Sequence, residues 1–379
     1  MTMMRMVTLQ AAFALLLLLT GCLNGSRSET IIIPGAEEDR MNGEAGQTFQ
    51  VKTIYRLPAA EMKTGQLLGW SGPKTVIGLF LDTMPSQALN AQVRRFSPPY
   101  DQAQPLHGIN ANTDSYELSP DGKLLSGYTK DRHGIALQVV SLADGKTKKI
   151  SPPNSEPWGL RSRAMKWSGN SRYVSFLTSG SAKGQTNVCV YDTKAGTTKV
   201  YPLTGLEDGH YFEGVTLSDD AGGILVETGD TIALGVRSGT GYRMQYDHPA
   251  ASEGTAWVNN DQFVFLGTDG TLFEYDGRNG VLSVLLEKVG SFRLSPDRQV
   301  IAYTQNEKDT IFAGKLQGNN ILFRNTVYQG ILPLRMDWSP GNDALLIDGR
   351  KQYPRSAVQS ETAAAAPAED YVPFIIQFQ

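Results

Sequence analysis

From residue 49 onward, the chain consists largely of short runs in which apolar and polar residues alternate. Alternation with a period of two predicts β-strands that bury one face. Clear examples are residues 173–177, 188–192 and 300–304. Neighbouring runs are joined by short turns that combine Gly with Asp or Asn, which is typical of β-hairpins. The pattern therefore predicts an all-β chain.

A turn signature recurs seven times along this region. It starts with Trp or Leu, usually continues with Ser, and ends in a turn rich in Pro, Asp, Asn and Gly. The copies start at Trp70, Leu118, Trp167, Leu217, Trp257, Leu294 and Trp338. Successive copies start 37 to 50 residues apart, and about 40–50 residues is what one four-stranded propeller blade needs. We therefore predict a β-propeller with seven blades over residues 49–379, or with six if one of the weak copies is chance.

The two ends of this region complement each other. After the signature at Trp338 the chain holds enough sequence for two further strands, the second within residues 371–378. One strand of that blade is then missing, while residues 49–57 form an extra strand before the first signature. We predict that this N-terminal strand pairs with the C-terminal blade and closes the ring, which removes two open sheet edges.

The first 22 residues have the pattern of an export signal. A single cation, Arg5, precedes an apolar run over residues 11–19 that is too short to span a membrane. The string Leu19-Thr20-Gly21-Cys22 resembles the lipobox of bacterial lipoproteins. This resemblance implies cleavage after Gly21 and acylation of Cys22 with chains such as palmitate. The alternative is an ordinary secretory signal with an incidental cysteine.

The expected organisation follows from these segments. Residues 1–21 are the signal peptide, residues 22–48 are the lipidated cysteine and a flexible polar tether, and residues 49–379 are the propeller. The expected location is the extracytoplasmic face of a bacterial membrane. The second cysteine, Cys189, lies in an alternating apolar run and is expected to be a buried strand residue. A net charge of −3 does not favour nucleic acid as a partner.

The signature identifies a resemblance as well as a period. The string from Leu118 to Lys123, Leu-Ser-Pro-Asp-Gly-Lys, and its relatives at Leu294 and Trp338 resemble the WD40-like propeller repeats of TolB-like proteins. The resemblance implies a propeller fold. TolB proteins carry an additional α/β domain before the propeller, and this chain has no room for one, so a TolB-type role in an envelope complex does not carry over directly.

Sequence patterns for catalysis are absent. There is no G-x-S-x-G nucleophile motif, and the four histidines are scattered without metal-ligand spacing. The aspartates of the signature, such as Asp121 and Asp297, are expected to shape turns. We therefore predict no catalytic residue, no metal and no cofactor.

A partner-binding face is predicted from propeller topology. The loops that enter each blade and those that join its second and third strands gather on one face, where they are free to vary. Aromatic and arginine side chains there can anchor a protein or a polar polymer. The alternative is that they are solvated loop residues or salt bridges lining the channel. The residues expected on this face are Lys130, Arg132, His133, Trp158, Arg161, Arg163, His210, Tyr211, Glu213 and Arg335.

Three functional hypotheses follow. The first is a membrane-anchored lipoprotein whose propeller is a non-catalytic binding or scaffold module for protein or polymer partners of the cell envelope. The second is a propeller enzyme, such as a lactonase, a lyase or a glycoside-acting enzyme, with its site assembled in the central channel. The third is a sensor or regulatory partner of an envelope signalling protein. The sequence favours the first.

Overall fold

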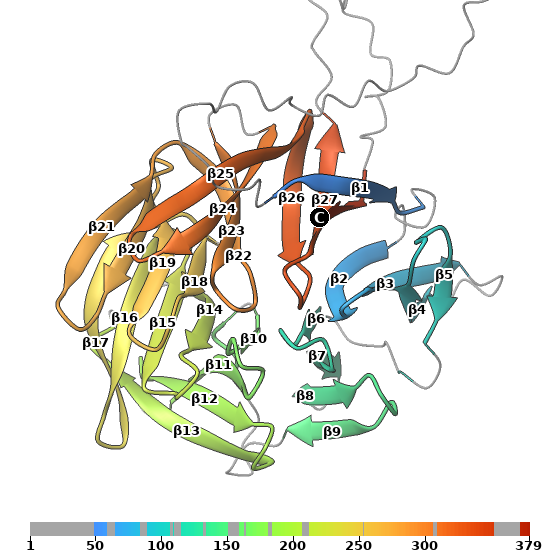
Figure 1. The fold of residues 1–379 in the computed structure, drawn as a ribbon. Coiled ribbons are helices and arrows are strands. Elements are labelled where there is room, and N and C mark those ends of the chain that lie inside the picture. The colour runs from blue at the N-terminus through green and yellow to red at the C-terminus, as the bar shows by residue number, and fades with distance from the viewer. Residues whose placement is uncertain are drawn as a thin grey trace, which may run out of the picture. The chain divides into compact units, whose positions relative to one another are not determined.

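The structure is a computed structural model of the chain. It describes residues 49–58, 65–83, 89–106, 109, 115–131, 134–150, 159–162, 164–180, 184–206, 212–252, 254–305, 309–351 and 372–379. Within these ranges the regular structure is entirely β-strand, and the strands form a β-propeller, which confirms the predicted all-β fold (Figure 1). None of the described residues form a helix that could cross a membrane. The signal peptide, Cys22 and the tether lie outside the described ranges.

Five separate four-stranded blades are formed by the described residues. The first contains β2 (Gly65–Gly72), β3 (Thr75–Thr83), β4 (Leu89–Phe96) and β5 (Ala103–Pro105), and the second β6 (Ser115–Leu118), β7 (Leu124–Asp131), β8 (Gly134–Ser141) and β9 (Thr147–Ile150). A third blade contains β18 (Thr255–Trp257), β19 (Gln262–Leu266), β20 (Leu272–Asp276) and β21 (Val281–Leu286). A fourth contains β22 (Val289–Leu294), β23 (Val300–Gln305), β24 (Thr310–Gln317) and β25 (Asn320–Gln329). The closing blade contains β26 (Ile331–Trp338), β27 (Ala344–Lys351), β28 (Phe374–Phe378) and β1 (Val51–Arg56).

The repeats that start at Trp167 and Leu217 share one eight-stranded sheet instead of forming two blades. Its strands are β10 (Lys166–Trp167), β11 (Tyr173–Ser179), β12 (Thr186–Asp192), β13 (Thr197–Thr204), β14 (Phe212–Leu217), β15 (Gly223–Thr228), β16 (Thr231–Ser238) and β17 (Gly241–Pro249). The outer strands β13 and β17 pair in parallel, Leu203 with Tyr242 and Thr204 with Arg243. The prediction of seven or six blades is therefore wrong: the described part has five separate blades, because these two repeats hydrogen-bond to each other at their rims.

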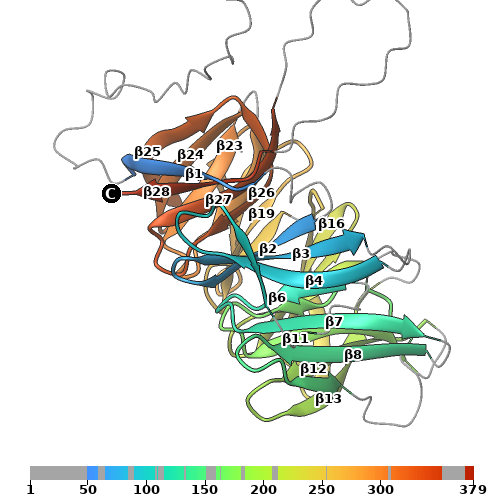
Figure 2. The same cartoon turned by 90° about the vertical axis from the view of Figure 1, so that its right-hand side faces the viewer.

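The predicted closure of the ring is confirmed. Strand β1 pairs antiparallel with β28, with Val51 opposite Phe378 and Arg56 opposite Phe374 (Figure 2). Residues 49–57 thus provide the outermost strand of a blade whose other three strands come from the C-terminal part of the chain. Phe49 also packs against Trp338 and Phe378, with ring centroids 6.3 and 5.9 Å apart. Contacts over more than 280 residues of sequence therefore join the two ends.

The core lies between consecutive repeats rather than at the centre of the ring. Each hydrophobic cluster in the described part combines side chains from two neighbouring repeats; one of them joins Leu225 of β15 to Phe263 and Phe265 of β19. Because a repeat is covered on both sides, its second strand is buried on both faces, and all six residues of β15 are buried. Simple alternation predicts one buried face, so this double burial comes from the packing of the blades.

Candidate functional site

The serine of the signature organises the turn that follows it. Five of these serines are buried, and each Oγ accepts a hydrogen bond from the backbone N–H five residues later, at 2.9–3.0 Å. Each Oγ also donates to an Asp or Asn oxygen in the same turn, at 2.6–2.7 Å. The five are Ser119, Ser168, Ser218, Ser295 and Ser339. Their hydroxyls are fully used within the turn.

The aspartates of the signature have the structural role expected of them. Asp121 accepts hydrogen bonds from Ser119 and from the backbone N–H of Lys123, and Asp297 is bonded in the same way by Ser295 and by the N–H of Gln299. These bonds hold a tight turn closed, as Asp commonly does. The signature is therefore a folding element and leaves no free nucleophile or base at these positions.

The tryptophans of the signature connect each repeat to the one before it. All four are buried, and each indole Nε1 donates to a backbone carbonyl just before the signature of the preceding repeat. The donor–acceptor distances range from 2.9 to 3.3 Å. The pairs are Trp70 with Asp337, Trp167 with Glu117, Trp257 with Thr216, and Trp338 with Arg293. Burial and a hydrogen bond together explain why Trp recurs here.

A group of charged side chains lies on the inner strands, where the first strands of neighbouring repeats contact one another. Arg293 lies 2.9 Å from Asp337, and Lys166 lies 3.7 Å from Glu117. These four residues occupy the same repeat position, directly before the signature Trp or Leu. Because successive strand residues point to opposite faces, a signature side chain packed between repeats directs its predecessor the other way. That positional rule is the signal that could have identified this group from the sequence.

Arg335, a predicted binding residue, is held within this group. Its guanidinium pairs with Asp337 at 2.5 Å and donates to the carbonyls of Leu67 and Leu68 in β2, at 2.9 and 2.7 Å. Burial alone would lower the pKa of Arg335, but the Asp337 carboxylate beside it raises the pKa above its usual value. Arg335 thus joins the closing blade to the first blade. A salt bridge is the alternative to partner binding that the sequence leaves open for this residue, and an ion pair with Asp337 is what the structure shows.

A buried carboxyl group lies across the strand pair from this arginine. Asp348 of β27 is the register partner of Arg335, and its Oδ1 has no hydrogen-bond partner among the described residues. Burial raises the pKa of Asp348, and Arg335 and Arg350 oppose that rise. The junction between the closing blade and the first blade is therefore polar at its inner end, whereas residues such as Trp70 and Leu346 pack in its apolar part.

Two further predicted residues have described side chains, Arg161 and Glu213. Arg161 lies 5.3 Å from the ring centroid of Phe212 and donates to Thr186 and to the carbonyl of Gly184. Glu213 is half-buried in β14. Lys130 is placed only as a backbone position in β7. The other predicted residues lie outside the described ranges: Arg132, His133, Trp158, Arg163, His210 and Tyr211. The described residues therefore do not test the predicted face, and its role stays a prediction.

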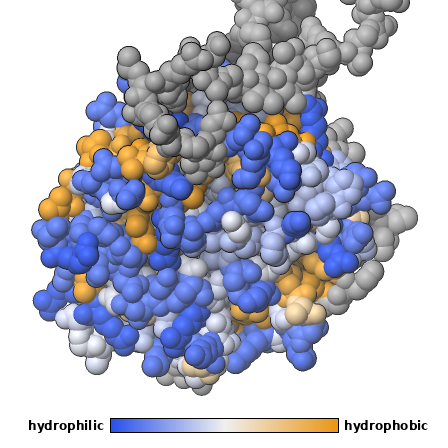
Figure 3. Space-filling view, viewed as in Figure 1, coloured by the Kyte–Doolittle hydropathy of each residue, from blue (hydrophilic) through white to orange (hydrophobic). Residues whose placement is uncertain are grey.

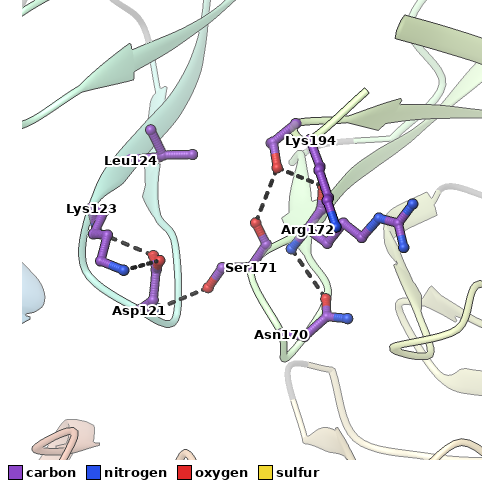
Figure 4. Close-up of a pocket in the computed structure, with 8 residues that line it drawn as sticks. Asp121, Lys123, Leu124, Asn170, Ser171, Arg172 and Lys194 are labelled. Carbon is purple, nitrogen blue, oxygen red and sulfur yellow. Dashed lines mark hydrogen bonds and ion pairs between the residues drawn. The ribbon is translucent and has the colours of Figure 1, made fainter. Parts of the chain in front are cut away.

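A cavity of about 420 Å³ lies on the side of the signature turns, between the repeats that start at Leu118 and Trp167 (Figure 4). The N–H of Asp121 donates to Ser171 Oγ at 2.8 Å across this junction. Most of the charged side chains that line the cavity are paired. Lys123 lies 3.4 Å from Asp121, and Arg172 lies 2.8 Å from Asp192. The lining residues are Asp121, Lys123, Leu124, Asn170, Ser171, Arg172, Thr193 and Lys194.

At the inner strands and beside this cavity, the charged side chains form structural ion pairs. Burial would raise the pKa of Asp192, but hydrogen bonds from Arg172 and from turn N–H groups lower it below the usual value. Groups of three potential metal ligands do not occur in the described part of the chain. What the inner strands do provide is a set of paired charges that connects the repeats.

We expect Asp337→Ala to lower the free energy of unfolding by about 1.5–3 kcal/mol, because it removes a buried carboxylate that accepts charge-assisted hydrogen bonds from two partly exposed arginines. Asp337 is only 8% exposed and is the counter-charge of both Arg335 and Arg293. Urea denaturation measures the change. The matched control is Asp261→Ala, at an exposed turn, which should change stability by less than about 0.5 kcal/mol. Equal losses in the two variants would show that the inner ion pairs contribute nothing.

Comparisons with known proteins show the fold. No protein-family model matches this chain, and no curated protein matches it. The propeller domain of the Trilobed protease from Pyrococcus furiosus superposes with a TM-score of 0.50 at 12% identity, over 76% of this chain and 91% of that one. A prolyl endopeptidase gives a TM-score of 0.51 at 13% identity, over 77% of this chain and 48% of that one. The C-terminal WD40 domain of Sif2 gives 0.42 at 12% identity, over 86% and 96% of the two chains.

At these identities the comparisons show architecture alone. This chain spans about half the length of the prolyl endopeptidase, so what that enzyme does as a whole is not transferred to it. The structure and its neighbours agree on one conclusion: the described part of the chain folds as an all-β propeller.

Proposed function

We propose that this protein is a lipoprotein anchored at the extracytoplasmic face of a bacterial membrane, where its propeller acts as a non-catalytic binding or scaffold module. The observation that carries the proposal is the string Leu19-Thr20-Gly21-Cys22 directly behind an apolar run. One acyl chain holds a protein only marginally on a bilayer, whereas the two or three chains of a lipidated cysteine hold it stably. The partners would be proteins or polymers of the cell envelope.

The structural use of the repeat residues supports a binding role. The signature serines, aspartates and tryptophans are all engaged in turns or between repeats. Arg335, which the sequence assigned to the binding face, is likewise paired. A ring built in this way presents loops on a rigid frame, which is how propellers commonly carry binding sites. The TolB-like character of the repeats fits an envelope location and belongs to the same proposal.

Cys22→Ser is expected to abolish incorporation of labelled palmitate and to remove the protein from the detergent-soluble membrane fraction. The hydroxyl cannot form the thioether that carries the lipid. The control is Cys189→Ala, which changes the only other cysteine, a buried residue of β12. That variant should still incorporate labelled palmitate and should remain in the detergent-soluble membrane fraction. Labelling that is unchanged in Cys22→Ser would overturn the lipoprotein assignment.

A further inference from the structure

Exposed apolar side chains gather on the outer strands of two neighbouring blades. Strands β21 and β25 are the last strands of their sheets, and they carry five of the large apolar side chains that are 39–56% exposed. In the space-filling view, hydrophobic surface gathers over β21 and toward β25 (Figure 3). We name this surface the apolar rim. It consists of Val281, Leu282, Val284, Leu322 and Phe323.

The two parts of the apolar rim flank one hydrophobic cluster. Leu285 and Leu286 follow Val284 in the chain, Ile321 precedes Leu322, and all three pack in the same cluster between the two blades. The exposed residues therefore lie beside one shared piece of core. Exposed apolar side chains that gather in this way mark interaction surfaces, and on edge strands they promote aggregation when uncovered.

Cationic side chains lie beside the apolar rim. Lys315 lies 5.8 Å from the ring centroid of Phe323, Arg324 is exposed on β25, and Lys288 is exposed just after β21. Neither β21 nor β25 contains an acid, and the exposed Glu287 directly follows β21. Exposed apolar residues bordered by Lys and Arg are the combination that settles at the interface of an anionic bilayer.

We propose that the apolar rim rests on the lipid bilayer to which the chain is anchored. The inference rests on the proposed function, because it uses the acylated Cys22 as the anchor and adds the face by which the folded body meets the membrane. Residues 23–48 separate the anchor from the first described residue. Even when fully extended, a segment of this length spans no more than about 90 Å, so the body stays near the surface.

Tethering explains why a small patch is sufficient. A short flexible linker gives an effective concentration in the millimolar range, at which even a weak contact is largely occupied. The interfacial layer is also hydrated, so the open edges of β21 and β25 keep water as a hydrogen-bond partner while their apolar side chains enter the lipid.

Site-specific fluorescence can test this orientation. The full chain offers a clean background, since lipidation consumes the Cys22 thiol, and Cys189 is fully buried with its pKa raised to about 11 by burial. An environment-sensitive maleimide dye would be attached to Val284→Cys or Leu322→Cys in protein reconstituted into vesicles of phosphatidylethanolamine and phosphatidylglycerol. The matched control is Lys148→Cys, on β9 of a different blade.

We expect blue-shifted emission at both rim positions and quenching by lipids that carry a nitroxide near the headgroup, with neither effect at position 148. Equal emission at all three positions would overturn the proposal. So would a rim signal that rises with protein density and resists the lipid quencher, because a second copy of the chain would then cover the rim. If the protein does not float with the vesicles at all, the acyl anchor has failed instead, which separates the two hypotheses.

Discussion

Removal of residues 49–57 should yield protein that is insoluble or polymerises. Among the described residues, strand β1 covers the outer edge of β28, and its loss exposes a strand in which four of the five residues are buried. An open apolar edge pairs readily with another chain. The same deletion removes Phe49 and Leu57, which pack in the clusters on the two sides of the closing blade. The soluble fraction and sedimentation velocity of the purified protein measure the effect.

The deletion variant and its control are both produced without residues 1–48, so the control consists of residues 49–379 and the deletion variant of residues 58–379. The control keeps β1 and should remain soluble, so it separates the loss of the strand from the loss of the tether. A soluble β1 deletion that melts in one cooperative transition would contradict the role of the closing strand.

Trp338→Ala is expected to lower the free energy of unfolding by about 3–5 kcal/mol, the usual cost of deleting a large buried aromatic side chain. Trp338 is 4% exposed and contacts Phe49 and Phe378, with ring centroids 6.3 and 5.6 Å away. Its Nε1 donates to the carbonyl of Arg293 at 3.1 Å. The substitution therefore removes packing, a hydrogen bond and the support of the closing strand together. Chemical denaturation at constant temperature gives the value.

Trp338→Phe separates the two contributions. It keeps most of the ring volume and loses the Nε1 donor, so the expected loss is about 1 kcal/mol from the hydrogen bond together with a small packing loss. If Ala and Phe destabilise the protein equally, the hydrogen bond to Arg293 dominates and the packing argument is wrong. A change of less than about 1 kcal/mol in Trp338→Ala would contradict both contributions.

The signature was an informative predictor because its residues act locally. Ser119 and Asp121 close a turn of a few residues, so their chemistry can be recognised without knowing what lies beside them. The burial of Trp70 could be predicted because Trp recurs at the same place in every second repeat. The closing strand could be predicted for a related reason: one incomplete repeat and one additional strand leave a single simple pairing.

The prediction failed where strands of different repeats meet. The parallel pairing of β13 and β17 depends on where two outer strands come to lie, and it involves only Leu203 and Thr204 on one side. Nothing in those residues distinguishes them from other edge residues. The role of Arg335 is similar, because its carbonyl partners Leu67 and Leu68 lie more than 260 residues away in the chain. An arginine near a loop could equally be a ligand-binding residue.

The all-β propeller, the turn chemistry and the joining of the two ends could be predicted from the residues alone, because hydrophobic periodicity and turn residues act over short distances and are repeated. Three features became known from the folded structure: two repeats share a sheet, the inner charges are paired, and apolar side chains remain exposed on β21 and β25. These features depend on which side chains meet after the ring has closed. A linear pattern does not contain that information, since the same residue can lie in a core, an ion pair or an open rim.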